Sequence, residues 1–330
     1  MSTEVSILRA SQTITGKAFE YALLRGIYER LSPQTKVTII ESAPYNNAKE
    51  CFGQINEEEQ ASNLLSASFA INLLLDLEPM LLYAVDQQDS LQLEIVPDVA
   101  GEDGDVRDIL AIRTQHEWEI GISAKHHHRA VKHPRLSASI DFGKKWLGIP
   151  CSPDFKERMK MIFRPLANIK KESQSSAKWD SLGNYIDNIY IPVLEAFKEE
   201  IQNIDSAHPN IVASRLVQYL IGRMDFYKVI KLKDKVEVQA YNLNGSLNQA
   251  SPNGRPKAKI QRLKLPKRIL DISYAEDSRT TLIFTMDEGW QMSFRIHVAS
   301  SRIEPSLKFD INLISSPHTL FINQLILPKP

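Results

Sequence analysis

The chain has 330 residues, enough for one large domain or two of ordinary size with a sizeable core. Its hydrophobic fraction of 43% and charged fraction of 24% are those of an average soluble globular protein. Cys51 and Cys151, the only cysteines, have neither disulfide nor zinc spacing, so we expect a reducing compartment, the cytoplasm. The most apolar run, residues 64–85, is interrupted by acids and a proline, which argues against a membrane span.

The net charge of zero conceals an uneven distribution of charge along the chain. Residues 50–106 contain many acids and no Lys, Arg or His, whereas residues 107–145 are rich in basic side chains. A second basic cluster, with no acid in it, spans residues 255–268. Such blocks suit a polyanionic partner, because only the contact face needs positive potential. The alternative is a solvated face or a loop.

The first predicted element is an amphipathic helix that begins near Thr15. The Thr15 hydroxyl is of the type that accepts hydrogen bonds from first-turn amides, so it is the expected N-cap. Phe19, Leu23, Ile27 and Leu31 follow at helical spacing on one stripe, which predicts the face turned to the core.

The remaining elements are a mixture of helices and strands, which predicts an α/β fold with a β-rich C-terminal third. Strands are predicted at residues 36–41 and 91–96, and between them residues 57–60 lead into a helix over residues 64–77 that Pro79 ends. The pattern of residues 129–147 is compatible with helix, and helices are also predicted at residues 154–166 and 191–204. From residue 233 onward, alternating apolar runs such as KVEVQAYNL, TTLIFTM and LKFDINLI predict strands separated by turns.

Residues 106–125 (VRDILAIRTQHEWEIGISAK) carry the strongest functional signal in the chain. Two apolar runs joined by a polar turn at residues 114–117 predict a β-hairpin. The hairpin would bring Asp108, at the start of its first strand, and Lys125, at the end of its second, to the same sheet edge. A carboxylate beside an ammonium can hold a divalent cation and an attacking water, and phosphodiester hydrolysis needs both.

The expected cation is Mg²⁺, which prefers oxygen ligands and takes only one or two protein carboxylates. Asp108 is the predicted main ligand, with Asp105 in reserve and Asp98 as a rival. Lys125 would orient the water or stabilise the developing negative oxygen. Glu119 shares a strand face with Lys125 but lies about 20 Å from it at 3.3 Å per residue, too far to share one ion.

The neighbouring run of histidines raises the alternative of a zinc site. Consecutive residues on an extended segment point to opposite sides, so at most His126 and His128 could share a face, and no further ligand has the right spacing. Phosphate contact or packing is the preferred interpretation.

The array Asp108…Ser123-Ala124-Lys125 resembles the PD-(D/E)XK nuclease signature, with Ser123 in the position where most members carry an acid. The strings GKAFE, EIGISAKHHHRAVKHPRLS and GWQMSFRIHVASSRIEPSLKFD resemble the HaeIII-type type II restriction endonucleases. The resemblance implies Mg²⁺-dependent cleavage of double-stranded DNA at the palindrome GGCC, between the central G and C. A palindromic target suits a two-fold homodimer. A cognate DNA methyltransferase would act on the same site without having to bind the protein.

Because Ser123 replaces the acid, a second carboxylate must come from elsewhere. Glu20, in GKAFE, is the preferred candidate, since the resembled superfamily packs such a helix beside its catalytic sheet. The alternative is an ordinary first-turn glutamate favoured by the helix dipole. With the resemblance we expect a nuclease core with its metal site in residues 1–160, a mainly helical segment in 161–230, and a β-rich DNA-recognition region in 231–330 that is integrated with the core.

Sequence-specific recognition needs basic and amide side chains that reach bases and phosphates. The residues expected to contact DNA are His126, His128, Arg129, Lys132, Arg135, Lys257, Lys259, Arg262, Arg295, His297 and Arg302. Two other functions remain open, a non-catalytic nucleic-acid-binding module and a repair nuclease on the same core.

Overall fold

The computed structural model describes residues 2–83, 89–97, 105–127 and 131–328. The chain forms two units, each assembled from separated segments. The first consists of Met1–Arg129, Arg223–Leu263 and Thr319–Pro330, and the second of Ala130–Gly222 and Lys264–His318. The division into three consecutive regions expected from the sequence stays a prediction.

The first unit contains a seven-stranded mixed sheet in the order β1-β2-β3-β4-β6-β7-β12. Its strands are β1 (Val37–Ile39), β2 (Leu91–Ile95), β3 (Ile109–Arg113), β4 (Trp118–His126), β6 (Phe226–Lys231), β7 (Lys235–Tyr241) and β12 (Phe321–Ile326). The β1–β2 and β4–β6 pairs are parallel, and the other pairs are antiparallel. The last strand therefore returns the chain's C-terminal segment to the sheet that holds the predicted hairpin.

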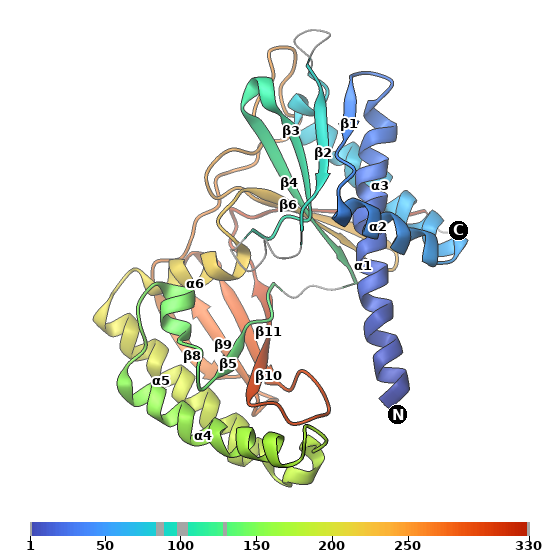
Figure 1. Cartoon of the computed structure of the whole chain (residues 1–330). Coiled ribbons are helices and arrows are strands. Elements are labelled where there is room, and N and C mark those ends of the chain that lie inside the picture. Colours follow the sequence, from blue (N-terminus) through green and yellow to red (C-terminus); the bar gives the residue numbers. More distant parts are fainter. Residues whose placement is uncertain (1, 84–88, 98–104, 128–130, 329–330) are drawn as a thin grey trace. The chain divides into compact units, whose positions relative to one another are not determined.

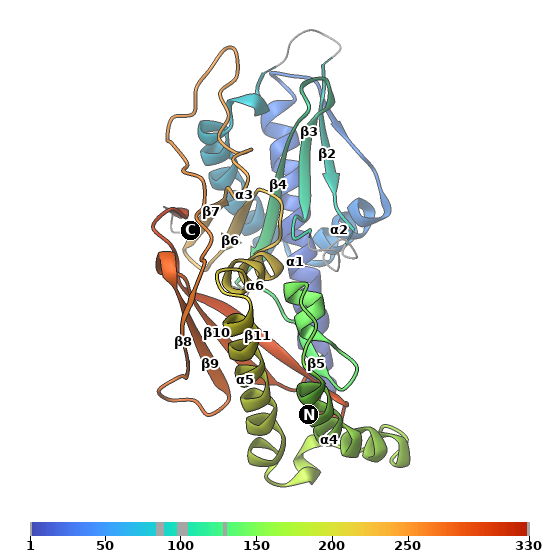
Figure 2. The same cartoon turned by 90° about the vertical axis from the view of Figure 1, so that its left-hand side faces the viewer.

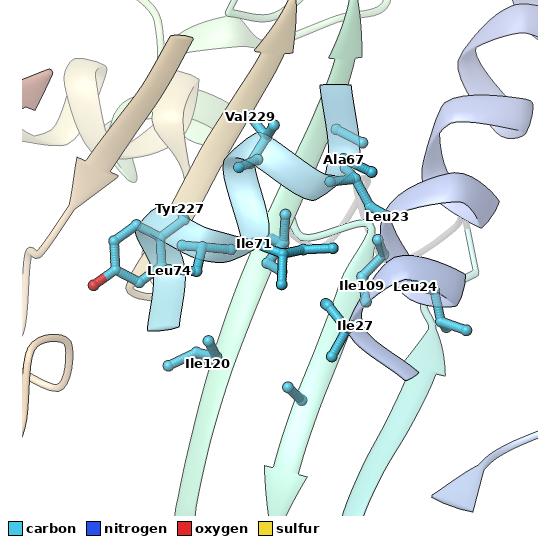
Figure 3. Packing of buried hydrophobic residues seen from close by; sticks show 14 of the residues in the cluster. Leu23, Leu24, Ile27, Ala67, Ile71, Leu74, Ile109, Ile120, Tyr227 and Val229 are labelled. Carbon is cyan, nitrogen blue, oxygen red and sulfur yellow. The ribbon is translucent and has the colours of Figure 1, made fainter. Parts of the chain in front are cut away.

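Three helices accompany this sheet, namely α1 (Ser2–Leu31), α2 (Ala43–Gln54) and α3 (Glu57–Leu77), and α1 packs against both α2 and α3 (Figure 1). The predicted stripe on α1 is confirmed, because Phe19, Leu23, Ile27 and Leu31 are all buried. Figure 3 shows side chains of α1 and α3 gathered over the strands, where Ile71 and Leu74 of α3 meet Ile109, Ile120, Tyr227 and Val229 of the sheet. The hydrophobic effect at this layer holds α1 in place.

Thr15 is not the N-cap of this helix, contrary to the prediction. The helix already begins at Ser2, and the Thr15 hydroxyl donates to the Gln12 carbonyl at 3.1 Å, as mid-helix threonines do. Residues 2–14 contain no glycine or proline that would end a helix upstream of Thr15, and the helix also continues through Gly16.

The second unit has a five-stranded antiparallel sheet in the order β5-β11-β10-β9-β8. Its elements are β5 (Arg135–Ser137), α4 (Pro153–Glu172), α5 (Ile191–Ala207), α6 (Val212–Ile221), β8 (Ile269–Tyr274), β9 (Thr281–Met286), β10 (Gln291–His297) and β11 (Ser306–Ser315). Aromatic rings form its core: Phe197 of α5 lies 5.0 Å from Phe309 and 6.0 Å from Phe294, between ring centroids. In Figure 2, helices α4 and α5 run along this sheet.

The expected helix at residues 129–147 is wrong for the part that the structure describes. That stretch contains the short strand β5 and a single five-residue helical turn, Gly143–Leu147. Pro134 lacks an amide donor, and β5 instead pairs with β11 through Leu136 and Leu307. The predicted class is confirmed: a mixed α/β fold with a helix-flanked mixed sheet and a β-rich C-terminal third. No helix among the described residues is long and apolar enough to cross a membrane.

Candidate active site at the edge of the β3–β4 hairpin

The predicted hairpin is present and consists of β3 and β4. Ile109 pairs with Ile122, and the Asp108 amide donates to the Ile122 carbonyl at 2.9 Å. Glu117 closes the turn with a positive φ of 48°. Beyond Ile122, β4 continues beside β6 alone, so the Asp108 side chain faces the last strand residues of β4.

Asp108 and Lys125 meet at this edge, as the hairpin predicted. The Lys125 ammonium lies 3.0 Å from Asp108 Oδ2. The same oxygen accepts hydrogen bonds from the Ser123 hydroxyl at 3.1 Å and the Ala124 amide at 2.7 Å. All three bonds go to Oδ2, which fixes the carboxylate and leaves Oδ1 to turn toward a cation. The Ser123 hydroxyl, at the position where the resembled signature carries an acid, is thus a hydrogen-bond donor to Asp108.

Glu20 is brought to the same site by α1, which lies against β4. Its side chain is buried, and burial raises its pKa to about 7. The nearby charge of Asp108 also raises this pKa, while Lys17 and Lys125 oppose the shift. Glu20 is thus within electrostatic reach of both hairpin residues.

Lys17 lies beside this candidate site, and the sequence interpretation did not name it. Its ammonium lies 3.0 Å from Glu20 Oε2, and only 9% of the residue is exposed. A lysine is rarely buried without a partner, and here the Glu20 carboxylate is that partner. The pair is a second carboxylate–ammonium contact, in addition to that of Asp108 and Lys125. The available signal was its spacing, since Lys17 precedes Glu20 by three residues and so shares its helix face.

The residues present fit a divalent cation. Two carboxylates, Glu20 and Asp108, are held close enough for one charge to act on the other, and a cation between them would relieve that repulsion. Among the described residues no three His, Cys, Asp or Glu side chains form a metal-binding group. Two carboxylates completed by water and phosphate oxygens are the ligand set that Mg²⁺ commonly takes. The rival Asp98 lies outside the described residues.

The reserve ligand, Asp105, is engaged elsewhere. Arg107 donates to both of its carboxylate oxygens at 2.8 Å and reaches Glu119 at 2.6 Å. Burial disfavours the charge on Asp105, but the hydrogen bonds from Arg107 outweigh it and lower its pKa. Arg107 passes directly over Gly121, where a Cβ atom would lie 2.0 Å from Arg107 Cδ. This arrangement secures the segment that leads into Asp108.

His126 is packed inside the first unit. Its Nε2 lies 3.2 Å from Glu59 Oε1, and its ring meets Phe19 edge-on at 6.5 Å. Burial, together with the charge of Lys231, lowers its pKa to about 4, so the ring is neutral at pH 7. These surroundings favour a role for His126 in packing over a contact between His126 and a DNA phosphate. His128 and Arg129 lie outside the described residues.

Three other expected DNA contacts belong to the long segment between β7 and β8. Lys257 is exposed and pairs with Asp76 at 2.6 Å, and Lys259 is exposed. Arg262 donates from Nε to the Leu243 carbonyl at 2.8 Å. Their DNA contacts stay predictions.

The other five expected contacts lie in the second unit. Lys132 is held by the Tyr219 carbonyl at 3.0 Å, and burial lowers its pKa to about 8. Arg135 pairs with Glu304 at 2.9 Å, and His297 Nδ1 lies 2.8 Å from the Val298 carbonyl. The exposed side chains are Arg135, Arg295 and Arg302. These positions separate the expected DNA contacts into two groups, one in each unit.

A helix-flanked mixed sheet with an acid and a lysine at one strand edge is consistent with the restriction-endonuclease class of nuclease. Comparison with known proteins agrees. The sequence model of the family described as HaeIII restriction endonuclease matches residues 16–317. The chain is 39% identical over 307 residues to the type II restriction enzyme HaeIII of Haemophilus aegyptius, covering 92% of this chain and 95% of that protein. No solved structure matches the chain.

The chain belongs to the HaeIII restriction endonuclease family. The enzyme class expected from the sequence, a site-specific endonuclease of type II, is thereby confirmed.

Proposed function

We propose that this enzyme hydrolyses both strands of double-stranded DNA at GGCC, between the central G and C, with Mg²⁺ as cofactor. The observation that carries the chemistry is the Asp108–Lys125 contact of 3.0 Å at the end of the hairpin, beside the buried Glu20. The target sequence rests on family likeness along most of the chain. The cytoplasm is the proposed compartment.

Asp108 and Glu20 would hold the ion. When bound, Mg²⁺ acidifies water and neutralises the charge that builds up on the phosphate. The Lys125 ammonium lies where it can orient the attacking water and stabilise the developing negative oxygen. Ser123 and the Ala124 amide keep Asp108 from rotating, so the carboxylate is preorganised for its role.

A palindromic target also supports a two-fold dimer, in which each copy would cut one strand. A methyltransferase with the same target would protect the host's own DNA without binding this enzyme.

The test is digestion of a plasmid of known sequence with Mg²⁺, and in parallel with EDTA, followed by sequencing of the fragment ends. We expect discrete fragments ending in GG and CC only when Mg²⁺ is present. A gel shift without cutting would point to a DNA-binding module, and ragged products would point to a repair nuclease.

The matched test of the site uses Asp108→Ala and Lys125→Ala. The Asp108 variant should show no cleavage above background, because the main ligand is gone. The Lys125 variant should lose about 10²–10³-fold in rate, the usual effect of removing one group that stabilises developing charge. Both should still bind the duplex, as measured by fluorescence anisotropy. Cleavage at the wild-type rate by either variant would remove that residue from the mechanism.

A further inference from the structure

Helix α4 in the second unit has two chemically different faces. Phe155, Met159, Phe163 and Leu166 are buried and hold the helix to its unit. Away from this stripe, Arg164 is exposed, and Met161 is 64% exposed. Helix α4 lies next to the short strand β5 (Figures 1 and 2).

A hollow of about 780 Å³ opens between α4, β5 and the segment that leads into β11. Ala138, Met161 and Ala167 contribute apolar surface to it. Hydroxyl groups come from Ser137, Ser139 and Ser306, and cations come from Arg135, Lys160, Arg164 and Lys170. Every lining residue belongs to the second unit, so the hollow is complete within it.

The charge around this hollow is positive. Its two acids are each paired within it, Glu157 with Lys160 at 3.2 Å and Glu304 with Arg135 at 2.9 Å. Arg164 and Lys170 have no acidic partner among the residues that the structure describes. Two uncompensated cations therefore remain at a concave site that also holds serine hydroxyls and apolar side chains.

We propose that this hollow, which we call the α4 groove, binds the sugar–phosphate backbone of the DNA duplex. Arginine, lysine and serine are among the side chains that commonly contact the phosphates and sugars of DNA, and this groove is lined by all three types. The proposal rests on the part of the proposed function that makes double-stranded DNA the ligand of this protein. The proposal adds Lys160, Arg164 and Lys170 to the expected DNA-binding residues. It also places them in the same groove as Arg135, which the sequence had already predicted to contact DNA.

The test measures how duplex affinity depends on salt, in EDTA so that no cutting occurs. Each phosphate contact contributes about 0.9 to the slope of log K against log salt concentration. Arg164→Gln should lower the slope by about 1, and Arg164→Gln with Lys170→Gln by about 2, on GGCC and unrelated duplexes alike. The matched control is Arg158→Gln, the same charge change on α4, because Arg158 is paired with Glu199 of α5 and lies outside the groove. Its slope should equal that of the wild type.

The outcomes separate this proposal from the proposed function. A wild-type slope for the double variant would overturn the groove proposal, whether or not the enzyme cuts at GGCC. An unchanged slope with an altered oligomeric state would also overturn it, because the groove would then bind protein. If the slopes fall as expected but the wild type never cuts DNA, the groove proposal stands and the proposed function fails. Thermal melting should change little in any variant, because Arg164 is exposed and Arg158 and Lys170 are only half-buried.

Discussion

Glu20 shows how one buried side chain couples the site to pH. Its pKa is raised to about 7, so in the metal-free enzyme the carboxyl is largely protonated below that pH and cannot ligate a cation. Activity should therefore fall as the pH drops through about 7. A higher Mg²⁺ concentration should shift this acidic limb of the pH–activity profile to lower pH, because Mg²⁺ competes with the proton for the Glu20 carboxylate.

The measurement is a pH profile of kcat/KM at two Mg²⁺ concentrations. Glu20→Gln should lower activity sharply at every pH and abolish the limb, because glutamine does not titrate. A limb that persists in Glu20→Gln, or does not move with Mg²⁺, would show that another group titrates.

The same residues show what the sequence could and could not predict about the site. Asp108 and Lys125 were found because they lie on one local hairpin, whose strand pairing fixes their distance. Lys17 was missed because its importance depends on α1 packing beside β4, a tertiary contact that the sequence pattern does not encode. Asp105 lies close to Asp108 in sequence, which made it the reserve ligand, but its carboxylate is paired with Arg107 in the structure.

At the scale of elements, the hairpin depends on the close passage of Arg107 over Gly121. In Gly121→Ala the new Cβ would displace Arg107 and break its contacts with Asp105 and Glu119. We expect a loss of about 1–3 kcal/mol in the free energy of unfolding, and slower cleavage because Arg107 directly precedes Asp108.

Chemical denaturation measures this effect, and Gly53→Ala is the control. Gly53 lies within α2, and nothing comes within 4 Å of a Cβ at that position. The control should gain about 0.5–1 kcal/mol, as alanine does over glycine in a helix. If Gly121→Ala and Gly53→Ala had the same free energy of unfolding, Arg107 would be shown to move away from residue 121 without loss of stability.

Secondary structure was predictable where local periodicity was strong, as in α5 and β9. Helix α3 was predicted from its apolar run and from Pro79, which ends it, because its apolar side chains do not concentrate on one face. Strand β6 was missed because every residue in it is buried, lysines 228 and 231 included, so it lacks the alternation typical of strands. Lys231 is accommodated by a 2.5 Å hydrogen bond to Asn63 of α3, a partner that no local pattern reveals.

At the scale of the whole molecule, strand β12 completes the seven-stranded sheet of the first unit. Deleting Thr319–Pro330 would remove β12 and expose the edge of β7, where six residue pairs are now formed. We expect a lower melting temperature, aggregation and loss of cleavage, even though the hairpin residues themselves are unchanged. Differential scanning fluorimetry and size-exclusion chromatography measure this. The control, Ile326→Lys, changes a side chain that is 78% exposed and should melt like the wild type.

Both units are discontinuous in sequence, since the chain passes from one to the other after residues 129, 222, 263 and 318. A single crossover between two related genes would therefore nearly always divide one unit or both. Neither unit can be exchanged as an uninterrupted cassette.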